Sequence, residues 1–314
     1  MTGGQQAPRL AVTGVSGQVG RAVLARARAA GFDPLGLTRA DLDLGDPDGI
    51  AGRLDALRPD LIINPAAYTA VDRAESEPEL AFRVNAEAPG RLAQWCAREN
   101  VPLIHLSTDY VFSGEATRPY REDDPLAPVS VYGASKAGGE RRVLASGAAA
   151  VIVRTAWVYD AEGRNFVTTM LRLGAGRDTL GVVDDQRGCP TAAPSLACGL
   201  LSIARQVWDA REDEAALAPL LGPVHLTDAG ETTWYHFAQA IFEAMAPAWG
   251  RRPRVSPLTT AQYPTPARRP AWSVLDLERA RARFGLVPPS WRESLGAVLA
   301  SCVHPAGSGG GDAL

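Results

Sequence analysis

Lys136 is the only lysine in this chain of 314 residues, and it stands four positions after Tyr132 in the segment VYGASKAGGE (131–140). On a helix this spacing puts both side chains on one face, a turn apart. A tyrosine with an ordinary pKa of about 10 is a poor acid–base group at neutral pH, and a nearby ammonium lowers that pKa. Lysine is also a compact point charge that can donate to a cofactor ribose, a role that the broader guanidinium group of arginine does not fit. The pair therefore predicts an acid–base centre, and the alternative is an exposed helix lysine.

A hydroxyl group is also needed to orient the carbonyl that is attacked. The segment HLSTDYVF (105–112) follows a predicted strand, and ligands bind at the carboxyl ends of strands in open parallel sheets. Ser107 and Thr108 both stand at that strand end. From their position alone, either hydroxyl qualifies as the donor to the substrate oxygen.

Glycines at a strand-to-helix turn indicate a nucleotide site. In VTGVSGQVGRAVL the glycines Gly14, Gly17 and Gly20 come directly after the first predicted strand, and Gln18 and Val19 complete the turn. Gly14 permits the tight turn, Gly17 lets the backbone approach a pyrophosphate at the helix N-terminus, and Gly20 allows close helix packing. The GxxGxxG spacing differs from the GxGxxG of many dehydrogenases, so a purely structural turn is the alternative.

The end of the second predicted strand, in LTRADLDL (37–44), bears on the choice of cofactor. An acidic residue there holds the ribose 2′-hydroxyl of NAD, whereas an arginine accommodates the 2′-phosphate of NADP. Arg39 therefore favours NADPH, with NADH still open. Asp43 and Leu44 are candidate contacts to the adenine end of the cofactor. An incidental surface arginine is the alternative, because arginine is abundant in this chain.

Short apolar runs alternate with helical patterns through the first half of the chain. Strands of near-continuous apolar character suit a sheet that is covered on both faces. Strand–helix alternation implies right-handed βαβ units, so the predicted fold is α/β with a doubly wound parallel sheet of the Rossmann type. The predicted strands are residues 9–13, 33–38, 60–64, 101–107 and 149–155, and a long amphipathic run covers 79–99.

After about residue 158 the pattern becomes less regular. Helices are expected at 165–175, 192–208 and 234–245, and strands at 180–185 and 222–228. The predicted organisation is an NADP-binding domain at 9–158 and a smaller, less regular C-terminal substrate-binding domain at 159–303, whose chain can cross back to the sheet. Residues 1–8 and 304–314 are expected to be disordered tails, because they offer almost nothing to bury.

Composition argues against several classes of protein. A net charge of −3 gives no reason to expect nucleic acid or an anionic membrane as a partner. The N-terminus lacks the pattern of a signal peptide, and no stretch approaches the ~18 apolar residues that span a bilayer, so a cytoplasmic location is expected. The four cysteines form no CxxC pair and no cluster with the four histidines, which predicts neither a disulfide framework nor a metal site.

The segments TGVSGQVG, LSTDYVF and VYGASKAGGE together resemble the extended short-chain dehydrogenase/reductase superfamily. Longer segments narrow the resemblance to the dTDP-4-dehydrorhamnose reductase family. Between residues 9 and 303 they are, in order, NPAAYTAVDRAESEPELAFRVNAEAP, STDYVFSGEATRPYREDDPLAPVSVYGASKAGGE, VRTAWVYDAEGRNFVTTMLRL, DDQRGCPT and YPTPARRPAWSVLD. The resemblance implies NADPH-dependent reduction of the C4 carbonyl of dTDP-4-dehydro-6-deoxy-L-mannose to dTDP-L-rhamnose.

The same resemblance implies roles for single residues. Tyr132 supplies the proton to the developing alkoxide, Thr108 hydrogen-bonds that oxygen, and Lys136 tunes Tyr132 and holds the nicotinamide ribose. Such donors act mostly in the transition state, where negative charge grows. Further implied cofactor contacts are Ala66, Ala67, Tyr68 and Asn85. Implied contacts to the nucleotide-sugar substrate are Asp109, Tyr110, Trp157 and Arg269. For Trp157 the alternative is packing in the core. Arg269 would clamp the diphosphate, and its neighbour Arg268 is the alternative for that role.

The chain also departs from the family pattern. Some members form metal-bridged dimers through acidic side chains in the first helix and near the GxPT segment, where this chain has Ala22 and Pro194. The departure argues against bound Mg²⁺ and against the metal-bridged dimer. A homodimer of another kind remains possible. Arg187 stands where an aromatic residue is common, which could alter the fit of the substrate. Alternatives to the reductase are a 4-ketoreductase for another nucleotide deoxysugar, a 4,6-dehydratase or 4-epimerase, and a non-catalytic NADP-binding regulatory subunit.

Overall fold

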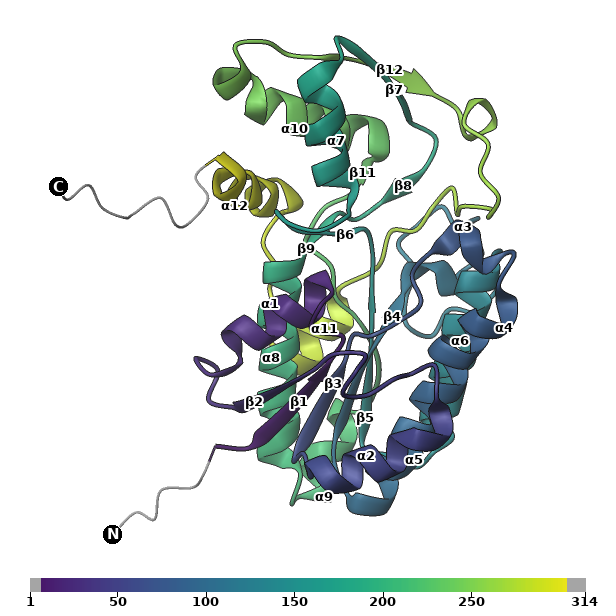
Figure 1. The fold of residues 1–314 in the computed structure, drawn as a ribbon, viewed down its shortest axis with the longest axis vertical. Helices are drawn as coiled ribbons and strands as arrows, with labels where there is room; N and C mark the ends of the chain where they lie inside the picture. Colours follow the sequence, from purple (N-terminus) through teal and green to yellow (C-terminus); the bar gives the residue numbers. More distant parts are fainter. Residues whose placement is uncertain (1–6, 304–314) are drawn as a thin grey trace, which may run out of the picture.

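A six-stranded parallel sheet forms the centre of the computed structural model, which describes residues 7–303 (Figure 1). The strand order is β10-β5-β4-β3-β1-β2, and β1 pairs with β2 on one side and β3 on the other. The strands are β1 (Arg9–Thr13), β2 (Asp33–Leu37), β3 (Leu61–Asn64), β4 (Leu103–Thr108), β5 (Ala150–Thr155) and β10 (Gly222–His225). The predicted doubly wound parallel sheet is confirmed.

Helices cover both faces of this sheet, because side chains along each strand alternate between the faces (Figure 1). Leu10 and Val12 of β1 pack into the core on one face, whereas Ala11 packs into the core on the other. The first face is covered by α1 (Gln18–Ala27), α8 (Ala193–Ala210) and α11 (Glu278–Phe284). The second is covered by α2 (Ile50–Leu57), α5 (Ala88–Glu99) and α6 (Val131–Leu144). The strand ends are therefore held rigidly from both sides.

The chain returns to the main sheet after leaving it at the end of β5. Leu196, Leu200 and Ile203 of α8 are buried in the core of the first face, where α8 packs against α1. β10 then pairs in parallel with β5, with Val224 opposite Val153. The proposed division of the chain into two domains at residue 158 stays a prediction.

The remaining elements form a second layer beyond the carboxyl ends of the strands, drawn above the sheet in Figure 1. Its core contains Tyr159, Phe237 and Trp291. The elements are β6 (Val158–Tyr159), α7 (Phe166–Gly176), β7 (Thr179–Val183), β8 (Arg187–Gly188), β9 (Thr191–Ala192), β11 (Thr232–Thr233), α10 (Trp234–Trp249), β12 (Arg254–Leu258) and α12 (Trp291–Val303). The short α9 (Glu214–Leu217) instead packs against α8 on the first face of the main sheet. Within residues 7–303, no helix is both long and apolar enough to cross a membrane.

The amphipathic run at 79–99 is not one continuous α-helix. α3 (Val71–Ala74) and α4 (Pro78–Phe82) are followed by a π-helical segment at Arg83–Glu87, and only then does α5 begin. The wider turn accommodates Asn85, whose fully buried side chain bonds to the loop after β3 and to α6. Such bulges are frequent at functional sites.

The N-terminal tail is shorter than expected. Pro8 is buried, and its carbonyl accepts a hydrogen bond from the Asp33 amide at the start of β2. Pro8 is therefore part of the folded domain and not of the N-terminal tail. The rest of the predicted tails, residues 1–6 and 304–314, lies outside the described residues.

Candidate active site

A cavity of about 690 Å³ lies at the carboxyl ends of the central strands. It is bordered by the glycine-rich turn, the strand ends, the start of α6 and the start of α10. Predicted site residues that line it are Gly14, Gly17, Gln18, Val19, Gly20, Ala66, Ala67, Thr108, Asp109, Tyr110, Tyr132, Lys136 and Trp157. Predicted site residues outside its lining are Arg39, Asp43, Leu44, Tyr68, Asn85 and Arg269. The structure thus brings the glycine turn and all three predicted catalytic residues to one cavity.

The glycine turn leaves a cradle of backbone. Gly14 has a positive φ of 59°, and a Cβ there would lie 3.0 Å from Ala66. A Cβ at Gly20 would lie 2.4 Å from the Gly14 carbonyl oxygen, so α1 can approach β1 only without it. Gly17 caps the N-terminus of α1 without any side-chain hydrogen bond, which leaves amide groups of the first turn for an anion. These residues fit the pyrophosphate of a dinucleotide.

A buried polar ladder crosses the sheet beneath this cradle. Thr13 Oγ1 donates to Asn64 Oδ1 (2.6 Å), and Asn64 Nδ2 lies 3.0 Å from His105 Nδ1. The Ala66 amide donates to Thr13 Oγ1 (3.3 Å), which fixes the chain against Gly14. Burial, assisted by the charge of Lys136, holds the pKa of His105 well below its usual range and keeps the ring neutral. Sequence reasoning missed these residues; polar side chains within apolar strands were the available signal.

Asn85 and Tyr68 bond to each other rather than line the cavity. Asn85 Oδ1 accepts from the Tyr68 amide (2.8 Å), and Asn85 Nδ2 donates to the Tyr68 carbonyl (3.0 Å) and to Ser135 Oγ (3.0 Å). The Tyr68 hydroxyl donates to Glu77 (2.6 Å). In this structure Asn85 therefore braces the loop after β3 against α6.

Tyr132 and Lys136 both lie on the cavity side of α6. The helix begins after Ser130, whose Oγ accepts from the Gly133 amide (3.2 Å), so the cap fixes the first turn. Lys136 is 2% exposed, and its Nζ donates to the Leu106 carbonyl of β4 (2.6 Å). The ammonium is thus attached to the strand that carries Ser107 and Thr108.

The expected acidification of Tyr132 by Lys136 is not found. Burial raises the pKa of Tyr132 to about 12, and the charge of Asp109 adds to this rise while contact with Thr108 opposes it. Burial also lowers the pKa of Lys136 to about 8, against the opposing effect of Glu140. Loss of hydration disfavours the charged form of both groups, and neither residue contributes to the pKa shift of the other. Tyr132 is therefore a protonated phenol at neutral pH.

Thr108 and Asp109 form a buried pair at the end of β4. Thr108 Oγ1 donates to Asp109 Oδ1 (2.9 Å) and accepts from the Tyr110 amide (3.2 Å). Burial raises the pKa of Asp109 to about 6, and the nearby hydroxyl groups of Ser273 and Thr108 oppose the rise. Asp109 Oδ2 and the hydroxyl of Thr155, a residue of the cavity lining, are buried without a hydrogen-bond partner among the described residues. Polar atoms of this kind are available to hydrogen-bond a polar ligand in the cavity.

Ser107 belongs to the structural support of the site. Its hydroxyl donates to Glu140, which forms a buried ion pair with Arg154 (Nη2–Oε2, 2.7 Å). Both Ser107 and Thr108 line the cavity and both donate to a carboxylate, but Thr108 also contacts Tyr132. This geometry favours Thr108 over Ser107 as the donor to a substrate.

The three residues at the end of β2 lie away from the cavity lining. Arg39 is exposed and donates through Nε to Asp43 Oδ1 (3.2 Å), and Asp43 also accepts from the Gly45 amide (2.7 Å). Leu44 is buried in the core of the second sheet face. Its side chain therefore packs in the core, and its contact with the adenine stays a prediction, while Arg39 lies at the surface.

Two tryptophans form an aromatic wall that the sequence predicted only in part. Trp157 stacks on Trp234 with ring centroids 3.5 Å apart and planes at 6°, and both residues line the cavity. Trp157 has a positive φ of 46°, which is strained for a large side chain. Trp234 was missed because it lies 77 positions later, at the start of α10, with no local motif around it.

Arg269 is engaged by another residue at the edge of the site. Its Nη1 and Nη2 donate to the two carboxylate oxygens of Asp72, at 2.5 and 2.8 Å. The neighbouring Arg268 is exposed and lies 3.6 Å from Glu115. The two candidate arginines therefore differ in their surroundings, and this difference could not be seen in the sequence.

A second-layer loop closes over the glycine turn. Asn165 caps α7 and donates through Nδ2 to Gln18 Oε1 (2.9 Å), while Arg21 of α1 pairs with Asp160 (3.3 Å). Gly163 and Arg164 of this loop also line the cavity. None of these loop residues was among the predicted site residues, because only the fold brings them to α1.

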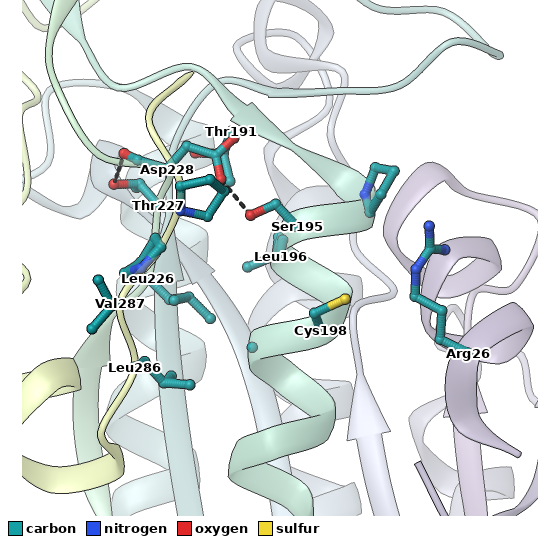
Figure 2. A pocket seen from close by; sticks show the side chains of 14 residues that line it. Arg26, Thr191, Ser195, Leu196, Cys198, Leu226, Thr227, Asp228, Leu286 and Val287 are labelled. Carbon is teal, nitrogen blue, oxygen red and sulfur yellow. Dashed lines mark hydrogen bonds between the residues drawn. The ribbon is translucent and has the colours of Figure 1, made fainter. Parts of the chain in front are cut away.

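A second cavity of about 420 Å³ lies between α8, the end of α1 and the chain before α12 (Figure 2). Figure 2 shows Asp228 accepting from Ser195, and Cys198 and Arg26 facing each other across adjacent helices. Pro194 lines this cavity, and Ala22 is buried on α1. The two stretches that the family resemblance linked to a bridging metal therefore adjoin here without a carboxylate at either position. Arg187, the other departure, pairs with Glu231 (2.8 Å) outside the first cavity.

A parallel sheet with a glycine cradle at its first turn, and a threonine, tyrosine and lysine beside that cradle, define a Rossmann-type oxidoreductase of the extended short-chain dehydrogenase/reductase class. The profile of the family described as "RmlD substrate binding domain" matches residues 8–303. The chain belongs to the dTDP-4-dehydrorhamnose reductase family, whose members are oxidoreductases.

Individual relatives are similar along almost their full length. The dTDP-4-dehydrorhamnose reductase of Sinorhizobium fredii is 44% identical over 91% of this chain and 95% of its own. A probable dTDP-4,6-dihydroxy-2-methyloxan-3-one 4-ketoreductase of Streptomyces antibioticus is 40% identical over 91% of this chain and 93% of its own. The solved dTDP-4-dehydrorhamnose reductase of Bacillus anthracis in complex with NADP is 32% identical, covers 94% of this chain and 99% of its own, and superposes with a TM-score of 0.84.

Proposed function

We propose that this protein uses NADPH to reduce the C4 carbonyl of dTDP-4-dehydro-6-deoxy-L-mannose, giving dTDP-L-rhamnose. The observation that carries the proposal is the meeting of Thr108, Tyr132 and Lys136 in the cavity that also contains the glycine cradle. NADPH, when bound, supplies the hydride. The residues of the chain then have to bind the sugar, orient its carbonyl and deliver one proton.

Tyr132 is the proposed proton donor. Its pKa of about 12 keeps the phenol protonated at neutral pH, which is the state that reduction needs. An alkoxide forming at C4 is more basic than a phenolate, so the proton moves from the Tyr132 hydroxyl to the sugar oxygen. Thr108 Oγ1, which can turn from Asp109 to the substrate, donates a second hydrogen bond to that oxygen.

Lys136 stabilises the phenolate that remains on Tyr132. With its pKa lowered to about 8 by burial, the ammonium is still mostly charged at neutral pH. Its bond to the Leu106 carbonyl uses one of its three N–H groups, and the other two are free for the phenolate and for the nicotinamide ribose. Lys136 therefore offsets part of the cost of a buried phenolate, while Tyr132 stays protonated until the alkoxide forms.

The substrate contacts are proposed from the remaining residues of the site. Trp157, stacked on Trp234, offers an apolar wall to the sugar, and Asp109 and Tyr110 border the same space. Arg269 is the proposed contact to the diphosphate. Arg39 at the end of β2 is proposed to select NADPH through the 2′-phosphate.

A second candidate is a 4-ketoreductase for a different dTDP-linked deoxysugar. It is supported by the similarity to the Streptomyces antibioticus relative, whose name refers to a different 4-keto substrate. Both candidates use the same proton donor and the same cofactor. They differ only in which sugar substituents fit against the aromatic wall.

The test is NADPH oxidation, followed by absorbance at 340 nm, across a panel of 4-keto nucleotide sugars. We expect the highest kcat/KM for dTDP-4-dehydro-6-deoxy-L-mannose. A higher value for another dTDP-linked 4-keto sugar would favour the second candidate. No turnover of any 4-keto sugar would contradict both, and NAD⁺ that co-purifies tightly would point to a dehydratase or epimerase instead.

A further inference from the structure

Asp72 and Arg269 join two distant parts of the chain at the edge of the first cavity. Asp72 lies in α3, directly after Val71 of the cavity lining, and Arg269 lies in the segment that follows β12. In Figure 1 that segment passes beside α3, and the hydrogen bonds establish the contact. Asp72 also accepts from the Ala267 amide (3.2 Å), so the carboxylate holds the segment at two points.

The pair leaves a defined part of the guanidinium group uncommitted. Nη1 of Arg269 donates to Asp72 and to the Ala267 carbonyl (2.7 Å), and Nη2 donates once to Asp72. Within residues 7–303, the N–H of Nε and the second N–H of Nη2 have no partner. These two N–H groups lie along one edge of the planar group, and such an edge matches two oxygens of a phosphate.

The surroundings distinguish this pair from an ordinary surface ion pair. The Arg269 side chain is only 18% exposed, and that of Asp72 is 42% exposed. The charges of both residues act on the hydroxyl of Tyr110, which lines the cavity. The hydrogen bond from Arg269 holds the pKa of Asp72 below its usual value, so the carboxylate is charged at neutral pH.

We infer that Asp72 is a positioning residue: it fixes the plane of Arg269 so that the free edge binds the diphosphate of the nucleotide sugar. The inference rests on the proposed function and adds the residue that prepares its anion site. A free arginine side chain loses considerable rotamer entropy when it grips a ligand, and a guanidinium already held in place loses less. The protein therefore orders this side chain before the substrate arrives.

The experiment is a double-mutant cycle read by calorimetric binding of dTDP and of thymidine to the full chain. We expect Asp72→Asn and Arg269→Ala each to weaken dTDP binding about tenfold and to leave thymidine binding unchanged. The double variant should lose no more than the stronger single variant, because Asp72 acts only through Arg269. In steady-state assays Asp72→Asn should raise the KM for the sugar nucleotide and leave kcat within about twofold.

The neighbouring exposed pair supplies matched controls. Glu115→Gln and Arg268→Ala remove the same charges at the arginine next in the chain and its partner, and we expect dTDP affinity within twofold of wild type. Thermal unfolding of every variant checks that folding is intact.

Three outcomes would overturn the inference: tighter dTDP binding in Asp72→Asn, which would make the carboxylate a competitor; equal losses for thymidine and dTDP; or additive losses in the double variant. A wild-type enzyme that binds dTDP but reduces no 4-keto sugar would contradict the proposed function, and the cycle would still decide the role of Asp72. Failure of the wild type to bind any nucleoside diphosphate would contradict both.

Discussion

Tyr132 and Lys136 are both held in surroundings that disfavour charge, with a pKa of about 12 for the phenol and about 8 for the ammonium. Spacing along the sequence predicted the pair, but it could not give the magnitude of desolvation, which depends on what covers the site. The phenol reaches the reaction protonated, and the lysine matters once negative charge has formed.

At the scale of this residue pair, kcat/KM for the sugar should fall as the pH rises above about 8. The ammonium of Lys136 loses its proton in that range, because burial has lowered its pKa from the ordinary value. Lys136→Met should reduce kcat/KM by roughly a hundredfold or more and abolish this basic limb. A pH profile of NADPH oxidation measures both. If kcat/KM of the variant still falls above pH 8 as in the wild type, the fall is due to another group.

Among the elements, α6 positions the acid–base pair because it can approach the chain after β4 very closely. A Cβ at Gly133 would lie 2.1 Å from the Tyr110 carbonyl oxygen, and one at Gly139 would lie 2.1 Å from the Asn85 carbonyl oxygen. Neither contact can be relieved by a side-chain rotation, since both partners are backbone. The glycines of this helix thus set the distance between Tyr132 and the end of β4.

Gly133→Ala should therefore destabilise the protein by about 1–3 kcal/mol and reduce kcat more than its loss of stability explains. The displaced first turn of α6 carries Tyr132 away from Thr108. Gly52→Ala is the matched control, because a Cβ at Gly52 of α2 would meet no atom within 4 Å, and it should stabilise by about 0.5–1 kcal/mol. Urea unfolding and kcat measure the two effects. Full activity in Gly133→Ala would contradict this role of the helix.

How far the sequence predicted these elements depended on whether their signal was local. The five strands of the first half were placed to within about two residues, because each is an apolar run between turns. The π-helical segment around Asn85 was missed, because its cause is the buried hydrogen bonds of one side chain with Tyr68 and Ser135. The burial of the Leu44 side chain was not visible either, because it depends on packing on the second face of the sheet.

At the scale of the whole molecule, the site exists only because distant segments meet. Trp234, Asn165 and Asp72 reach the cavity or its edge from separate parts of the chain, and no local pattern announced them. Sequence motifs therefore named residues that do meet in one cavity, but they did not reveal the residues of the surrounding walls. Cofactor and substrate should likewise stabilise the molecule as a whole, because residues of both layers line the cavity that we propose they occupy.

Cofactor binding should be visible in the unfolding temperature. A ligand at 100 times its Kd stabilises the folded state by about 2.7 kcal/mol, so saturating NADPH should raise Tm clearly. At equal concentration NADH should raise Tm less, if Arg39 contacts the 2′-phosphate. Arg39→Ala should remove that difference and leave the Tm without ligand unchanged, since Arg39 is exposed. An undiminished preference for NADPH in the variant would remove Arg39 from the cofactor site.

The central claim is that Tyr132 delivers the proton to the reduced carbonyl. Its most direct test is single-turnover NADPH oxidation with dTDP-4-dehydro-6-deoxy-L-mannose by wild type and Tyr132→Phe, with dTDP affinity and Tm measured alongside. We predict a fall in rate of at least a hundredfold, with dTDP affinity and Tm near wild type. A variant that reduces the sugar at the wild-type rate would contradict the account.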